Sequence, residues 1–207
     1  MVEVGAEPHL VERARALIPA QGRAVLGITG PPGAGKSTLT SALLAELGPD
    51  VGHLPMDGFH LADVQLDRLG LRDRKGAPET FDVDGYVTAL RRLHDAPDRT
   101  LYLPGFERDL EQPIAAAIAI PPSARLVITE GNYLLLPDGG WEHVRPLLAE
   151  VWYVDLDDDV RRERLVRRHE QFGKSPDAAR EWVERSDEAN ARRVAATHVR
   201  ADLTTSV

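Results

Sequence analysis

Short apolar runs alternate with segments of helical spacing along most of the chain. Compact apolar runs predict buried strands at residues 23–30, 53–56, 124–131 and 150–156. Other segments carry apolar residues three or four positions apart, which predicts helices at residues 8–19, 36–47, 83–96, 141–149, 159–173 and 175–196. Strands that alternate with helices are typical of an α/β fold, in which a parallel sheet is flanked by helices on both faces.

Three further segments are less regular. Residues 100–109 predict a short strand that ends at Pro104, and residues 201–207 predict a terminal strand. Residues 62–80 are charged and are interrupted by glycine and proline, so we expect a long functional loop with one helical turn.

Composition narrows the class of protein. The chain has 207 residues without an internal repeat, and residues 1–207 are expected to form one domain. It has no cysteine, which excludes disulfides, thiolate zinc sites and cysteine nucleophiles and fits a cytoplasmic protein. We expect no signal peptide, because residues 1–22 lack a basic segment followed by an apolar core. We expect no membrane partner, because no apolar run approaches the ~20 residues of a membrane-spanning helix.

The net charge of the chain indicates which partners it can bind. The formal net charge is −8, which is unfavourable for wrapping a nucleic acid backbone, so we expect no nucleic acid partner. Any phosphate-binding face must therefore be local. The sequence says little about oligomeric state, and a homodimer is one alternative.

The strongest motif is a glycine-rich turn after the first predicted strand. Residues 30–37, GPPGAGKS, match the P-loop spacing, with a strand before them and a helix after them. Backbone N–H groups of such a turn point at phosphate oxygens, Lys36 neutralises the β- and γ-phosphates, and the Ser37 hydroxyl is a ligand for Mg²⁺. The residues predicted to bind ATP here are Gly30, Pro31, Pro32, Gly33, Ala34, Gly35, Lys36, Ser37 and Thr38. A ligand-free glycine turn is the alternative, and the matching flanks disfavour it.

Acidic residues follow three of the predicted strands. Asp57, Glu130 and Asp155 stand at these strand ends, and ligands of an open α/β sheet bind beyond the carboxyl ends of its strands. Glu130 and Asp155 compete for the second contact to Mg²⁺. The sequence around Asp155 is also typical of the acidic start of a helix. Glu130, by contrast, is followed by Gly131, which lets the backbone approach a ligand. The predicted metal site is therefore Ser37 and Glu130.

Four motifs together resemble a known family. GPPGAGKST, PMDGFHL, RKGAPETFD and EGNYLLL, in this order, resemble the superfamily of uridine kinase, phosphoribulokinase and bacterial pantothenate kinase. The resemblance spans residues 22–205 and is nearest to small bacterial members described as nucleoside/nucleotide kinase-like or fructose-transport-system kinase-like. It implies a P-loop kinase core that uses ATP, Mg²⁺ and a small hydroxyl-bearing acceptor. It also implies that Asp57 is the base facing the acceptor hydroxyl, where the residues alone allow a plain Asp-Gly turn.

The sequence indicates the residues that contact the acceptor less clearly. His60, Arg74 and Lys75 follow the predicted base in the long loop, and the resemblance adds Asp82. Arg108 is a candidate ligand for an anionic or polyhydroxy acceptor. The alternatives are a solvated loop histidine for His60 and a surface arginine for Arg108. Residues 103–114 depart from the Pro-x-Tyr-Asp pattern of uridine kinases, so the acceptor's identity does not carry over.

A basic helix follows the fourth strand. It places Arg161, Arg164 and Arg168 on one face, which is the usual pattern of a solvated charged surface. Its position resembles the lid of nucleotide kinases, at about residues 158–175. The resemblance implies that Arg164 and Arg168 bind ATP and that Arg168 assists catalysis. Asn190 resembles a position near the adenine.

Other classes are disfavoured. Residues 82–85, DVDG, mimic a GTPase switch motif, but no apolar strand precedes them and no Asn-Lys-x-Asp motif occurs. The acidic balance argues against a motor that remodels nucleic acid. A nucleoside monophosphate kinase stays as the main alternative, although its ionised acceptor would not need Asp57. The expectation is an ATP-dependent kinase that phosphorylates a hydroxyl of a sugar, a pantothenate-like compound or a nucleoside.

Overall fold

A five-stranded parallel sheet forms the centre of the computed structural model, which describes residues 5–206. Residues 1–4 and 207 of the predicted single domain lie outside the described part. The strand order is β2-β5-β1-β6-β7, and every pairing in this sheet is parallel. The strands are β1 (Ala24–Thr29), β2 (Val51–Pro55), β5 (Leu126–Glu130), β6 (Glu150–Asp155) and β7 (Leu203–Ser206). The predicted α/β class and the terminal strand are thereby confirmed.

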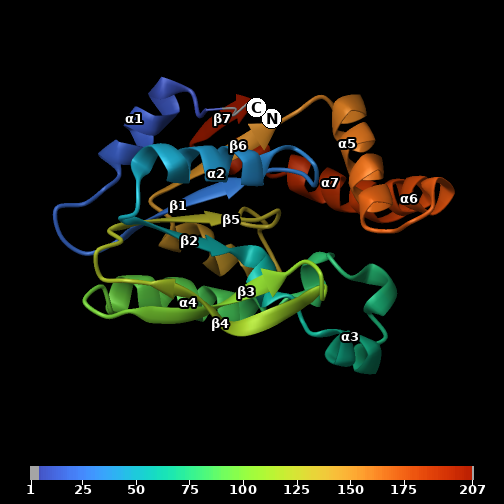
Figure 1. Cartoon of the computed structure of the whole chain (residues 1–207), viewed down its shortest axis with the longest axis horizontal. Coiled ribbons are helices and arrows are strands. Elements are labelled where there is room, and N and C mark those ends of the chain that lie inside the picture. Colours follow the sequence, from blue (N-terminus) through green and yellow to red (C-terminus); the bar gives the residue numbers. More distant parts are fainter. Residues whose placement is uncertain (1–4, 207) are drawn as a thin grey trace.

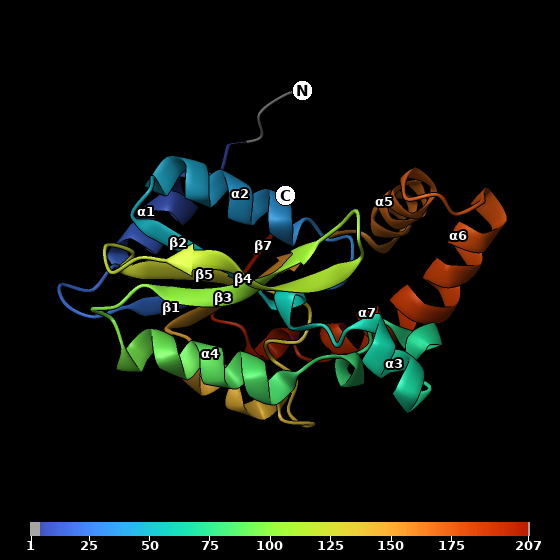
Figure 2. The same cartoon turned by 60° about the horizontal axis from the view of Figure 1, so that its bottom comes forward.

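Helices cover both faces of this sheet, as Figure 2 shows. On one face, α1 (Pro8–Ala16) and α2 (Lys36–Leu47) pack their apolar sides against alternate residues of β1 and β5. On the other face, α4 (Val83–Asp95) buries Tyr86 and Leu90. The side chains of each strand alternate between two separate cores, which is the expected result of the period of two along a strand. Burial on both faces explains the continuous apolar runs.

Several predicted elements have other bounds. Helix α1 ends at Ala16 rather than near residue 19. The helix predicted for residues 141–149 is wrong: this segment forms two short 3₁₀ turns, because Pro146 has no N–H for a continuing helix. The loop after β2 is more ordered than predicted, with α3 (Asp63–Leu69) followed by two 3₁₀ turns.

A separate antiparallel hairpin was not predicted. It consists of β3 (Leu101–Glu107) and β4 (Gln112–Ile120), and it covers part of the α4 face. Pro104 does not end β3, because it lies at the shift of register between Leu103 and Gly105, where the ladder is already interrupted. The strand therefore continues and brings residues 106–108 towards the carboxyl ends of the main sheet.

The C-terminal helices project from one side of the sheet (Figure 1). They are α5 (Asp158–Gln171), α6 (Pro176–Trp182) and α7 (Glu188–Ala195). The helix predicted for residues 175–196 is interrupted by a π-helical turn, Val183–Asp187, and such turns are frequent at functional sites. Among the described helices, none is both long and apolar enough to cross a membrane.

Gly58 marks where the hairpin meets the main sheet. A Cβ at this position would lie 2.4 Å from the carbonyl oxygen of Pro104. The glycine of the PMDGFHL motif therefore lets the β3 backbone pass directly over the turn that carries Asp57.

We predict that Gly58→Ala lowers the free energy of unfolding by about 1–3 kcal/mol, because the added methyl group forces two backbone segments apart. Urea denaturation would measure the change. Gly5→Ala is the matched control, since a Cβ at Gly5 meets no atom within 4 Å. Equal stability of the two variants would contradict the close packing of hairpin and turn.

Candidate active site

The carboxyl ends of the parallel strands bring the predicted chemical groups to one edge of the sheet. The P-loop follows β1, which lies between β5 and β6, so Glu130 and Asp155 flank it. Asp57 follows β2, the neighbour of β5 on the other side. The sheet order thus places Asp57 on the side of Glu130, away from Asp155.

Lys36 is held inside its own loop. Its Nζ donates hydrogen bonds to the carbonyl oxygens of Gly30 and Pro31, both at 2.9 Å. Burial lowers the pKa of Lys36 to about 8, although the negative charges of Glu130 and Asp57 oppose this shift. Two weak carbonyl partners are readily exchanged for phosphate oxygens, and so the ammonium is placed to accept a nucleotide.

A cavity of about 370 Å³ lies between the P-loop and α5. Its lining residues are Gly33, Gly35, Lys36, Ser37, Thr38, Arg164, Leu165 and Arg168. Gly33 has φ +81°, and a Cβ there would lie 2.8 Å from Cγ of Leu165, so the loop and the helix touch. The structure therefore brings the two predicted arginines of the basic helix to the P-loop.

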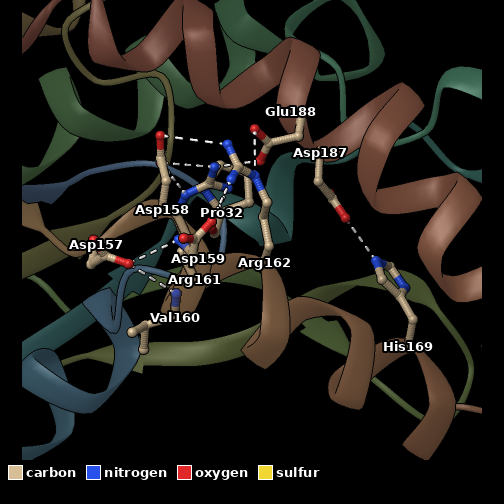
Figure 3. A network of polar contacts seen from close by, with 10 residues as sticks. All are labelled: Pro32, Asp157, Asp158, Asp159, Val160, Arg161, Arg162, His169, Asp187 and Glu188. Carbon is tan, nitrogen blue, oxygen red and sulfur yellow. Dashed lines mark hydrogen bonds and ion pairs between the residues drawn. The ribbon is translucent and has the colours of Figure 1, made fainter.

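Arg161 behaves differently from the prediction. It does not share the exposed face of α5, because its side chain is only 1% exposed and turns into the protein. Figure 3 shows its guanidinium between Asp158, Glu188 and the carbonyl oxygen of Pro32. Arg161 therefore joins the P-loop to α5 and α7. No local pattern indicated this role, since Glu188 lies 27 positions along the chain.

Asp57 is the central charged residue on the other side of the site. It lies in a 3₁₀ turn after β2, and its Oδ2 accepts a hydrogen bond from Nη2 of Arg108 at 2.5 Å. Burial opposes ionisation of Asp57, but the charges of His60, Arg108 and Lys36 outweigh it and hold the pKa of the carboxyl below its ordinary value. Burial lowers the pKa of His60, although the negative charge of Asp57 and the hydrogen bond to its backbone oxygen oppose this shift.

His60 lies in an aromatic layer rather than in solvent. Its Nδ1 is 2.8 Å from the backbone oxygen of Asp57, and its ring centre is 4.0 Å from Phe81 and 5.0 Å from Phe106. The alternative of a solvated loop histidine is thereby excluded. Its contacts position the ring directly beside the predicted base.

Lys75 and Arg108 lie around the same aromatic side chain. The ring centre of Phe106 is 5.6 Å from Nζ of Lys75 and 5.0 Å from the guanidinium carbon of Arg108. Lys75 also donates to Asp63 at 2.7 Å and to the backbone oxygen of Glu111. It thus ties the loop after β2 to the tip of the hairpin.

Two predicted acceptor residues do not join this group. The carboxylate of Asp82 accepts a hydrogen bond from the N–H of Gly85 at 2.9 Å and caps α4, so the structure gives it a structural role. Arg74 pairs with Glu79 and borders a second, smaller cavity of about 160 Å³. Asn190, on α7, lines this second cavity rather than the one at the P-loop.

Glu130 suits a metal ion better than Asp155 does. Its side chain is 13% exposed, and its Oε2 is buried without a hydrogen-bond partner in residues 5–206. The carboxylate of Asp155 is exposed and accepts from the N–H of Leu156 at 3.1 Å, close to the start of α5. An orphaned carboxylate oxygen and the Ser37 hydroxyl are hard donors of the kind that Mg²⁺ prefers. Across the described residues no group of three His, Cys, Asp or Glu side chains could hold an ion.

Comparison with known proteins shows which sequences this chain resembles. A family model described as ABC transporter matches residues 20–80, which contain the P-loop. A protein of Schizosaccharomyces pombe named as a candidate uridine kinase is 33% identical, covering 97% of this chain and 90% of that protein. The uncharacterized protein YggC of Escherichia coli K12 is 37% identical, over 88% of this chain and 77% of its own.

A solved structure extends the likeness to the whole fold. It is that of a candidate fructose transport system kinase from Silicibacter sp. TM1040, with a TM-score of 0.86 and 36% identity. It covers 95% of this chain and 98% of the neighbour. The chain therefore belongs to the P-loop kinase family whose members include these uridine kinase-like and fructose transport kinase-like proteins.

Proposed function

We propose that the protein transfers the γ-phosphate of ATP to a hydroxyl group of a small metabolite. The observation that carries this proposal is the place of Asp57: it lies in the turn after β2, at the edge of the sheet where the P-loop follows β1. A protein that transfers phosphate to an alcohol needs a carboxylate at this place, whereas a protein that only binds nucleotide does not.

The nucleotide side is served by the P-loop and α5. Backbone N–H groups of the loop and Lys36 hold the β- and γ-phosphates, and Arg164 and Arg168 face them across the cavity. These arginines act as a lid that neutralises charge and excludes water. Ser37 and Glu130 would hold Mg²⁺, which supplies further neutralisation of the phosphate charge when bound.

On the acceptor side, Asp57 orients the hydroxyl. The hydroxyl oxygen forms a bond to the γ-phosphorus, the bond from that phosphorus to the bridging oxygen breaks, and ADP leaves. The proton of the hydroxyl passes to Asp57 and from there to solvent. A carboxylate with a lowered pKa is a weak base, but it can accept a hydrogen bond and then a proton late in transfer.

The acceptor is proposed only as a class. The names of the relatives suggest a nucleoside or a sugar, and the resemblance in the acceptor loop adds a pantothenate-like compound. A nucleoside monophosphate kinase is the second candidate. Its acceptor phosphate is already ionised and would gain nothing from Asp57.

We predict that Asp57→Asn lowers kcat for an alcohol acceptor by roughly 10²–10⁴-fold, because the base is removed. ADP release would be followed with Mg-ATP and a panel of uridine, cytidine, fructose, ribose, glycerate, pantothenate, ribulose 5-phosphate and UMP. Binding of Mg-ATP, measured by calorimetry, should change little. Stimulation by UMP that survives the substitution would move the protein to the nucleotide kinases.

We further predict that ATP affinity falls as pH rises through about 8, the pKa of Lys36 in the free protein. Bound phosphates raise the pKa of this ammonium, so binding below pH 8 needs no proton, whereas binding above it requires proton uptake. Calorimetric Kd values at pH 7 and pH 9.5 would show the loss, and Lys36→Arg, which stays charged, should remove it. A flat profile for the unmodified protein would contradict the role of Lys36.

A further inference from the structure

The predicted base is already paired in the free protein. Arg108 occupies Oδ2 of Asp57, which leaves one carboxylate oxygen for the acceptor hydroxyl and lowers the basicity of both. Transfer therefore proceeds best when Arg108 has another partner.

Arg108 is free to exchange partners. Its side chain is 43% exposed, so it can move without carrying a buried charge, and Asp57 is the only carboxylate with which it pairs among residues 5–206. It follows β3 near the tip of the hairpin, where its guanidinium lies over the ring of Phe106.

Two cations, Arg108 and Lys75, lie together beside the ring of Phe106. Lys75 lies over the same ring, and its partner Asp63 is shared with Arg72 at 2.7 Å. Arg72 also has Asp67 at 3.7 Å, but Lys75 has no second carboxylate in the described residues. Lys75 thus shares its carboxylate with Arg72, and Arg108 takes its carboxylate from the predicted base. An anionic ligand would give both cations a partner of their own.

We propose that the acceptor carries an anionic group, a carboxylate or a phosphate, and that Arg108 leaves Asp57 to bind it together with Lys75. The inference rests on the proposed function, because it names the substrate class of that same site. The exchange makes Arg108 a specificity-determining residue: a neutral alcohol gives it no new partner and leaves the base paired. An anionic alcohol supplies the partner and frees Asp57 in the same step.

The test uses pairs of alcohols that differ mainly in the charged group: pantothenate and panthenol, glycerate and glycerol, ribose 5-phosphate and ribose. Initial rates of ADP formation would be measured for the unmodified protein, Arg108→Gln and Arg91→Gln. Arg91 is an exposed residue of α4 with no ion pair among the described residues, and it serves as the control. The pair that shows the preference distinguishes a carboxylate from a phosphate.

We expect kcat/KM to favour the anionic member by roughly 100-fold, and Arg108→Gln to remove at least ~10-fold of that preference, mainly through KM. The acidic limb of kcat/KM against pH should move to higher pH in Arg108→Gln, because the pKa of Asp57 is no longer lowered by the guanidinium. This shift reports the pairing of Asp57 with Arg108 in the free protein, whereas the lost preference for the anionic member reports the exchange of partners. Equal use of both members by the unmodified protein would overturn the inference.

Binding measurements distinguish this inference from the proposed function. The same pairs would be titrated by calorimetry into protein saturated with a non-hydrolysable ATP analogue and Mg²⁺. Tighter binding of an anionic member that Arg108→Gln abolishes, without any transfer, would refute the proposed function and keep the anion site. Absence of any anionic preference in binding would refute the anion site, whatever the turnover.

Discussion

The buried ammonium of Lys36 is the interaction on which the site depends. Its charge is desolvated by the P-loop and is compensated by Glu130 and Asp57, which come from two other parts of the chain. Only a parallel sheet with β2 and β5 on the same side of β1 brings these three groups together. The order of strands therefore determines which charged groups meet at the site, as well as how the sheet packs. In the proposed function, phosphate oxygens of the nucleotide replace the carbonyl partners of Lys36.

Two parts of the fold border the site around this ammonium. On one side, α5 carries arginines over the P-loop, and Arg161 anchors the start of that helix to Pro32 and to Glu188 on α7. Figure 3 shows a second link, from His169 near the end of α5 to Asp187 in the π-helical turn, at 2.8 Å. On the other side, the hairpin carries Arg108 to Asp57, with Gly58 as its contact point. In the proposed function, α5 thus borders the nucleotide and the hairpin borders the acceptor. This division suits a reaction between two substrates.

Sequence patterns predicted the parts of this account that depend on neighbours along the chain. The P-loop, the strand ends and the basic helix are local, and they appear where expected. The contact between Asp57 and Arg108 spans 51 positions and depends on a hairpin whose second strand, rich in alanine, shows no alternation. The burial of Arg161 depends likewise on a distant glutamate. Asp82 is a different case, since an aspartate ahead of a helical segment is a readable cap. The structure confirms the cap, and the substrate contact that the resemblance implies for Asp82 stays a prediction.

The central claim is that Asp57 and the P-loop act together on an alcohol. The most direct measurement supplies ATP labelled with ¹⁸O in its γ-phosphoryl group to the protein and a mixture of small metabolites, and follows the label by mass spectrometry. The account predicts a labelled phosphate monoester of one alcohol, formed by the unmodified protein and lost in Asp57→Asn. Label found only in inorganic phosphate or in a nucleoside diphosphate would contradict it.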